Sequence, residues 1–495
     1  MAKNQPVESN NFNQCVQDAR RAALDSEAGP ADPASYDELR ERLLVSGPKL
    51  PPLYRENVSE PFAKKLEELG RGGFDQILAR DRGRDREAAL MFDIAQAILQ
   101  RGEGYLEKST AAFQEMVSDL YDGFLSVQER KGIRAAEGCV IPPLVKWGLP
   151  ERGPYTWTAS ATRVFDVNAS IVSLPPANAK LGLIAWTGLA HETAGHDILA
   201  ANTGLVEELS RRVNKAISAL PSLGPHAAVL AEYWSIRIEE SAADVLGILN
   251  MGPAAAVGLI GYLRAMNEAH GDRCRLRHCG DDRDVHPMDL MRGYLVKAVV
   301  DLLPFKENKD RWCKIIEEQV QEDTVDQLQV DGTPIRCNVA KDAAAEVARV
   351  LVSEPLDSLN MHSLSEIQTW RDIDEQAAQE LEPHLTRLGP LDQIYIRGFY
   401  AAHVLAAALI ASMRPSAEIP LIFDRALGIM KLMHDKNPSW GPLKIMSPSD
   451  LAMLRVYVPT SEERGVMEPA PPTAQAHAEN AAPDVPYDED ISGYD

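Results

Sequence analysis

The chain of 495 residues has little of what marks secreted or membrane proteins. Its six cysteines are scattered, which is too sparse for a disulfide scaffold and fits a reducing compartment. No apolar stretch follows the N-terminal residues, so no secretory signal is predicted. The longest apolar run, near 401–413, is too short to cross a bilayer. From these absences we expect a cytoplasmic protein without a membrane-spanning segment.

Positive charge is also in short supply, because 51 Lys and Arg stand against 73 Asp and Glu and the formal net charge is -22. This excess of negative charge argues against a nucleic-acid backbone or an anionic membrane surface as a partner. The sequence contains no Gly-rich phosphate loop and no G-x-S-x-G pattern, which argues against nucleotide or esterase chemistry. The segment CRLRHC at 274–279 lacks a second ligand pair at a usual spacing, so we predict no zinc site there.

Apolar residues recur at three- and four-residue spacing over most of the chain, which predicts a mainly α fold (α+β) with a small sheet. Residues rich in Pro, Thr, Val and aromatics at 139–176 predict short strands, and VDGTPIRCNV predicts a small hairpin. Helices are predicted at 204–219, 224–249, 253–269 and 287–303. The expected segments are an N-terminal polar segment at 1–50, a helical region at 51–138, a segment of strands and buried helices at 139–305, a second helical region at 306–465 and a disordered acidic tail at 466–495.

The segment GLAHETAGHDIL at 188–199 contains His191, Glu192 and His196. A histidine pair with an intervening glutamate is typical of zinc hydrolases, in which the imidazoles bind the ion and the glutamate takes a proton from water. The usual spacing is four residues, whereas here it is five, so a regular helix would aim the two rings about 140° apart. A π-type turn widened by one residue would bring them together, and Gly195 tolerates such backbone geometry. The alternative is a buried helix that happens to carry two histidines.

A third ligand is predicted in AEYWSIRIEESAADVLGIL at 231–249. Glu240 and Asp244 are four residues apart and share one face of a helix. We expect Glu240 to complete the ligand set and Asp244 to accept a hydrogen bond from a ligand histidine. Glu239 lies about 100° round the helix and is the alternative ligand. A solvated acidic patch is the other interpretation of these carboxylates.

The pattern His191-Glu192-x-x-x-His196, with EESAAD at 239–244, resembles the gluzincin metallopeptidases. The histidine spacing is similar to that of the dipeptidyl peptidase III family, whose pattern is HELLGH followed by EECRAE. The second motif here ends in Asp where that family has Glu, and it is closer to thermolysin-like enzymes. The resemblance covers roughly 165–300. It implies a helical zincin-like catalytic domain at 139–305, flanked by helical regions.

Further residues outside the two motifs are candidates for substrate binding and catalysis, the first of them by resemblance and the last two by the chemistry of their side chains. In gluzincins an edge strand before the metal helix pairs with an extended peptide substrate, and Asn168-Ala169 stand at the start of the corresponding strand. His286 is similar to a histidine that hydrogen-bonds the oxyanion, and Tyr233 is a candidate second donor. Arg292 is a candidate to hold a substrate carboxylate. The alternatives are an ordinary sheet strand, a helix-capping histidine, a buried tyrosine and a plain salt bridge.

We therefore expect a zinc metallopeptidase in which His191, His196 and Glu240 bind Zn²⁺ and Glu192 is the general base. Helical regions on both sides of the site favour oligopeptides as substrates. One alternative is a metal-dependent hydrolase of a non-peptide amide, which would use the same machinery with a different pocket. Another is a catalytically silent helical scaffold that contains metal. Glu192 argues against this scaffold, because a structural zinc needs no base.

Overall fold

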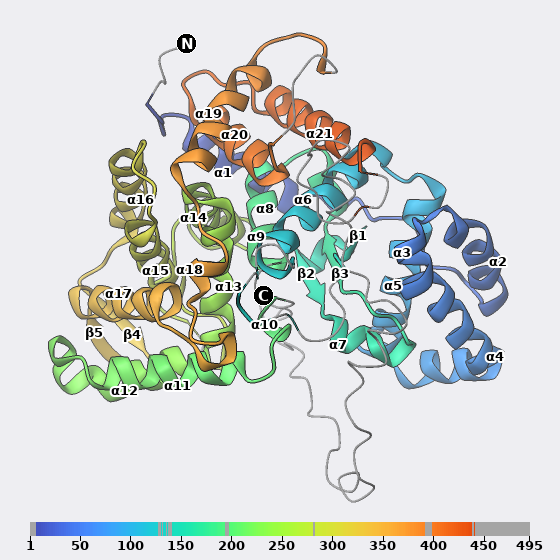
Figure 1. Ribbon diagram of the computed structural model, residues 1–495, viewed down its shortest axis with the longest axis horizontal. Helices are drawn as coiled ribbons and strands as arrows, with labels where there is room; N and C mark the ends of the chain where they lie inside the picture. The colour runs from blue at the N-terminus through green and yellow to red at the C-terminus, as the bar shows by residue number, and fades with distance from the viewer. Residues whose placement is uncertain are drawn as a thin grey trace, which may run out of the picture.

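The computed structural model of the chain describes residues 6–126, 130, 132–134, 136, 141–193, 198–280, 283–391, 398–437 and 440 (Figure 1). The fold is mainly α with a small sheet, which confirms the predicted class. The tail predicted at 466–495 lies outside the described residues. None of the described helices is long and apolar enough to cross a membrane.

A mixed three-stranded sheet lies near the middle of the molecule in the order β1-β3-β2 (Figure 1). Its strands are β1 (Leu144–Trp147), β2 (Tyr155–Trp157) and β3 (Ile171–Leu174). β1 runs parallel to β3, and β2 runs antiparallel to β3 on its other side. The hairpin predicted at VDGTPIRCNV is present as β4 (Gln327–Val330) and β5 (Thr333–Arg336).

The sheet separates two hydrophobic cores, because successive side chains of a strand point to opposite faces. Leu144 and Ile171 belong to the smaller core. The helices that contribute to this core are α2 (Tyr36–Ser46), α3 (Pro52–Tyr54), α4 (Glu60–Arg80) and α5 (Glu87–Glu103). Val145 and Val172, one position further along each strand, face the larger core. The sheet is therefore covered on both faces.

The larger core takes side chains from helices along most of the chain. They are α1 (Phe12–Ala23), α6 (Glu107–Leu125), α8 (Leu183–Thr187), α9 (Leu189–Glu192), α10 (Ile198–Ala200), α11 (Leu205–Ser218), α12 (Ala227–Ile236), α13 (Ile238–Met251), α14 (Pro253–Ala269), α15 (Asp289–Leu302), α16 (Lys309–Asp323), α17 (Cys337–Ser353), α18 (Leu364–Ile367), α19 (Asp372–Thr386), α20 (Ala401–Met413) and α21 (Ile419–Asp435). This core is continuous across residue 305, where α15 packs against α17. The helices after the expected catalytic segment therefore share its core.

The helices expected between 204 and 303 are present with one break. α11, α14 and α15 lie close to their predicted ranges. The helix predicted at 224–249 is instead divided into α12 and α13 at Arg237. The buried guanidinium of Arg237 lies over the ring of Tyr233 and 3.6 Å from a carboxylate oxygen of Asp331, in the turn between β4 and β5. Helical periodicity does not reveal this break, because Asp331 is distant in sequence.

A buried carboxylate on α6 makes the stability of the fold depend on pH. Glu115 is 1% exposed, and its Oε2 lies 3.5 Å from Nδ1 of His434 on α21. Burial raises the pKa of Glu115 well above its usual value, and the nearby Asp119 raises it further. An unfolded glutamate loses its proton near pH 4.3, at about the usual value, whereas the folded chain keeps the proton to higher pH. The contribution of Glu115 to the free energy of unfolding therefore falls as the pH rises above that value.

The Glu115→Gln variant cannot ionise and is expected to escape this loss. Its melting temperature should rise relative to wild type as the pH increases from about 4 to about 7. Glu68→Gln, at an exposed position of α4, is the control and should show a constant difference. A Glu115→Gln difference that does not change with pH would contradict the prediction.

Candidate metal centre

The segment that carries the histidine motif contains the short helices α8, α9 and α10, which lie in the middle of the molecule (Figure 1). α9 carries His191 and Glu192 and packs against α13. Gly247 of α13 allows this approach, because a Cβ atom there would lie 3.1 Å from the backbone carbon of Ala190. The small residue lets α13 come close enough for its side chains to reach those of α9.

His191 is held between two carboxylates of α13. Its Nε2 lies 3.1 Å from Oε2 of Glu240, and its Nδ1 lies 2.8 Å from Oδ1 of Asp244. Burial disfavours a charged imidazole, but the hydrogen bonds to Asp244 and Glu240 outweigh it and raise the pKa of His191 to about 10. Glu240 is buried, whereas Glu239 is exposed. The structure thus brings His191, Glu240 and Asp244 together, and these residues come from the two sequence motifs. It favours Glu240 over Glu239 as the partner of His191.

Arg292 does not face a substrate, which corrects the prediction made from the sequence. Its Nε and one terminal nitrogen lie 2.8 and 2.7 Å from the two oxygens of Asp244, and the side chain is buried. Burial would raise the pKa of Asp244, but the charges and hydrogen bonds of Arg292 and His191 lower it to about 2. Arg292 therefore neutralises the carboxylate that orients His191, and the salt-bridge alternative is the correct one.

His286 approaches the same group from the loop before α15. Its Nε2 lies 3.4 Å from Oε2 of Glu240, and its Nδ1 lies 3.0 Å from Oδ1 of Asp284. Its side chain is 39% exposed, so the ring is also accessible from solvent. Burial lowers the pKa of His286, but the charge of Glu240 and the hydrogen bond to Asp284 outweigh this and raise it. His286 therefore stands at the open side of the His191–Glu240 contact.

Glu192 contacts the sheet rather than α13. The hydroxyl of Thr156, on β2, donates to the Glu192 carboxylate at 3.2 Å and approaches its backbone carbonyl at 3.3 Å. Sequence reasoning missed Thr156, because no motif connects an isolated threonine with a glutamate 36 residues later. The only local signal is its place in a short run of aromatic and β-branched residues.

The prediction that the strand after Asn168-Ala169 is an edge strand that pairs with a peptide substrate is wrong. Asn168 and Ala169 precede β3, but β3 is the middle strand and has β1 and β2 on its two sides. The N–H of Asn168 donates to the carbonyl of Asn57, and the carbonyl of Ala169 accepts from the Thr162 hydroxyl at the end of α7 (Ala159–Thr162). These backbone groups are already used. β2 is the edge strand on the side of Glu192.

The two tyrosines near the site have different surroundings. Tyr233 is buried, and its hydroxyl accepts the backbone N–H of Met288 at 2.7 Å. It therefore holds the loop that carries His286, and its predicted role as a second donor to the oxyanion stays a prediction. Tyr262 on α14 was not predicted. Burial raises the pKa of Tyr262, and the charge of Glu192 raises it further.

Part of the predicted motif lies outside the described residues, including Gly195 and His196. Thr193, directly after Glu192, is the last described residue before 194–197, so the predicted widened turn also lies outside the described residues. Within the described part of the chain, no group of three or more His, Cys, Asp or Glu side chains is arranged to hold a metal ion. The predicted zinc ligands are His191, His196 and Glu240, so two of the three, His191 and Glu240, lie among the described residues.

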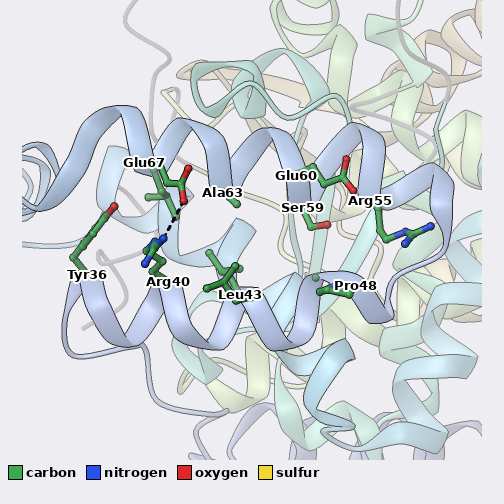
Figure 2. Close-up of a pocket in the computed structure, with 12 residues that line it drawn as sticks. Tyr36, Arg40, Leu43, Pro48, Arg55, Ser59, Glu60, Ala63 and Glu67 are labelled. Carbon is green, nitrogen blue, oxygen red and sulfur yellow. Dashed lines mark hydrogen bonds and ion pairs between the residues drawn. The ribbon is translucent and has the colours of Figure 1, made fainter.

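A cavity of about 200 Å³ lies elsewhere, between α2 and α4 (Figure 2). Its middle is apolar around Leu43, and Arg40 at one end lies 3.3 Å from Glu67. Arg55 and Glu60 line the other end (Figure 2). The charges balance at both ends, so the lining selects neither an anion nor a cation, and we assign this cavity no function.

Comparison with known proteins leaves the site to be interpreted from its own geometry. No family model matches the chain, and the comparisons with curated proteins and with solved structures also give no match. Any function is therefore inferred from His191, Glu192, Glu240 and the groups that contact them.

Proposed function

We propose that the protein is a zinc-dependent peptidase of the gluzincin type. The observation that carries this proposal is the contact between His191 Nε2 and Glu240 Oε2 at 3.1 Å, with Asp244 bound to the other ring nitrogen. Two tetrahedral zinc ligands at about 2.1 Å would have donor atoms about 3.4 Å apart. The observed separation is close to that value. A carboxylate behind a ligand histidine is the usual support of such a site.

Two of the three proposed ligands, His191 and Glu240, lie together in the described part of the chain, with His286 beside Glu240 on their open side. His191 and Glu240, with His196, would hold Zn²⁺, which supplies Lewis-acid activation of water and of a carbonyl group when bound. Glu192 is the proposed general base and passes the proton on to the leaving amine. Thr156 donates to the Glu192 carboxylate and fixes its orientation. His286 stands beside Glu240 and is the proposed donor to the oxygen that gains negative charge.

The sheet supports a peptide as substrate. The outer edge of β1 is closed, because the Gln100 side chain exchanges two hydrogen bonds of 2.8 and 2.9 Å with the backbone of Trp147. No other strand of the described chain pairs with the outer edge of β2, whose residues are only partly buried. An extended peptide can add to such an edge through main-chain hydrogen bonds. We therefore propose that β2, next to Glu192, binds the peptide in place of the strand that follows Asn168.

Removal of the metal tests this proposal. Treatment with a chelator is expected to lower cleavage of an oligopeptide library at least about 100-fold, and added zinc should restore it. The Glu240→Ala variant should not recover under the same zinc concentration. Cleavage that survives complete metal removal would contradict the proposal. Zinc uptake without cleavage of any peptide would instead favour the non-peptide amidase or the silent scaffold.

A further inference from the structure

A second polar group, distant from the motifs in sequence, holds the edge strand β2. Asp93 of α5 is buried, and its Oδ2 accepts hydrogen bonds from the Tyr155 hydroxyl and from Nε1 of Trp157, both at 2.7 Å. Its Oδ1 lies 2.6 Å from Nζ of Lys146, which is on β1 and only 3% exposed. One carboxylate therefore joins both edge strands of the sheet to α5.

The alternation of β2 connects this group with the candidate site. Tyr155 and Trp157 point to the α5 face of the sheet, and Thr156 between them points to the opposite face. On that face the Thr156 hydroxyl contacts Glu192. A strand of three residues has few ladder hydrogen bonds of its own, so side-chain anchors decide its position. Movement of Tyr155 and Trp157 would carry Thr156 and the outer edge of β2 with them.

We infer that Asp93 is a positioning residue, which fixes β2 so that its edge receives the peptide and Thr156 orients Glu192. This inference rests on the proposed function. Asp93 itself touches neither Glu192 nor His191 and acts through Tyr155 and Trp157. The ammonium group of Lys146 lies beside the Asp93 carboxylate and balances its charge, while the other carboxylate oxygen accepts from both donors.

The experiment compares Asp93→Asn with a matched control, Glu375→Gln. Glu375 of α19 is also buried and accepts from two indoles, those of Trp312 and Trp370 at 3.0 and 3.2 Å, but it lies outside the sheet. In zinc-reconstituted protein, Asp93→Asn is expected to speed hydrogen exchange in β2 and to raise KM for an oligopeptide about tenfold. Its zinc content should stay at the wild-type level. Glu375→Gln should leave both the exchange of β2 and KM unchanged.

Two milder variants keep the test decisive where Asp93→Asn does not fold. Tyr155→Phe and Trp157→Phe each remove one hydrogen bond and should produce the same changes to a smaller degree. Wild-type exchange in β2, or an unchanged KM, in these variants would overturn the inference. A wild-type protein that cleaves no peptide would overturn the proposed function instead. Hydrogen exchange in β2 would then still test whether Asp93 anchors this strand. Faster exchange in the variants than in wild type would uphold that role, and unchanged exchange would overturn it.

Discussion

The Glu192→Gln variant is expected to lose peptide cleavage by about 100- to 10,000-fold in kcat while it retains zinc. Glutamine has nearly the same shape and can still accept from the Thr156 hydroxyl, but it cannot take a proton from water. Glu192 is not in the predicted ligand set, so the metal should stay bound. Steady-state kinetics on an oligopeptide, with metal analysis of the same preparation, checks both expectations.

Glu239→Gln is the matched control for this experiment, because Glu239 is an exposed glutamate directly beside Glu240. It should keep both activity and zinc. A Glu192→Gln variant with wild-type kcat would rule out Glu192 as the base. A variant that also lost its zinc would show that Glu192 is needed to build the site, and the loss of activity could not then be assigned to proton transfer.

The second large effect is expected for Arg292→Met, which leaves the Asp244 carboxylate buried beside His191 without its main counter-charge. Removal of one partner of a buried ion pair typically costs about 3–5 kcal/mol in the free energy of unfolding. Because Asp244 orients the ring of His191, zinc affinity should also fall about 10- to 100-fold. Urea unfolding of the apo protein and competition with a zinc indicator measure the two effects separately.

Arg264→Met controls for the loss of any buried arginine. Arg264 is 3% exposed, and its Nε lies 2.8 Å from a carboxylate oxygen of Asp323 on α16, whereas Arg292 pairs with α13. It should destabilise the fold to a similar degree and leave zinc affinity unchanged. Equal zinc affinity in Arg292→Met and wild type would remove Asp244 and Arg292 from the support of the metal centre.

The contacts that could be predicted from the sequence are those encoded by helical spacing. Glu240 and Asp244 are four residues apart, so any partner that reaches one of them can reach the other, and His191 contacts both. The edge strand could not be predicted in the same way. β3 is the last strand before α9 in the chain, yet it is central in the sheet, because order in sequence does not fix order in space.

The other differences between predicted and observed contacts have a common cause. In each case the residue that a side chain contacts is far away in the sequence. The sequence alone predicts that Arg292 binds a substrate carboxylate. In the structure its guanidinium instead pairs with Asp244, which lies 48 residues earlier in the chain. The Tyr233 hydroxyl accepts the backbone N–H of Met288, 55 residues later, which the sequence does not reveal. Thr156 and Asp93 belong to no motif, and only the pairing and alternation of β2 show what they contact.

The most direct test of the proposed site is the zinc content of purified, zinc-reconstituted protein, measured by mass spectrometry beside three variants. We predict about one zinc per chain in wild type and in Glu239→Ala. Glu240→Ala and His196→Ala should lose it. No bound zinc in wild type, or equal retention by Glu240→Ala and Glu239→Ala, would contradict a metal centre built on His191 and Glu240.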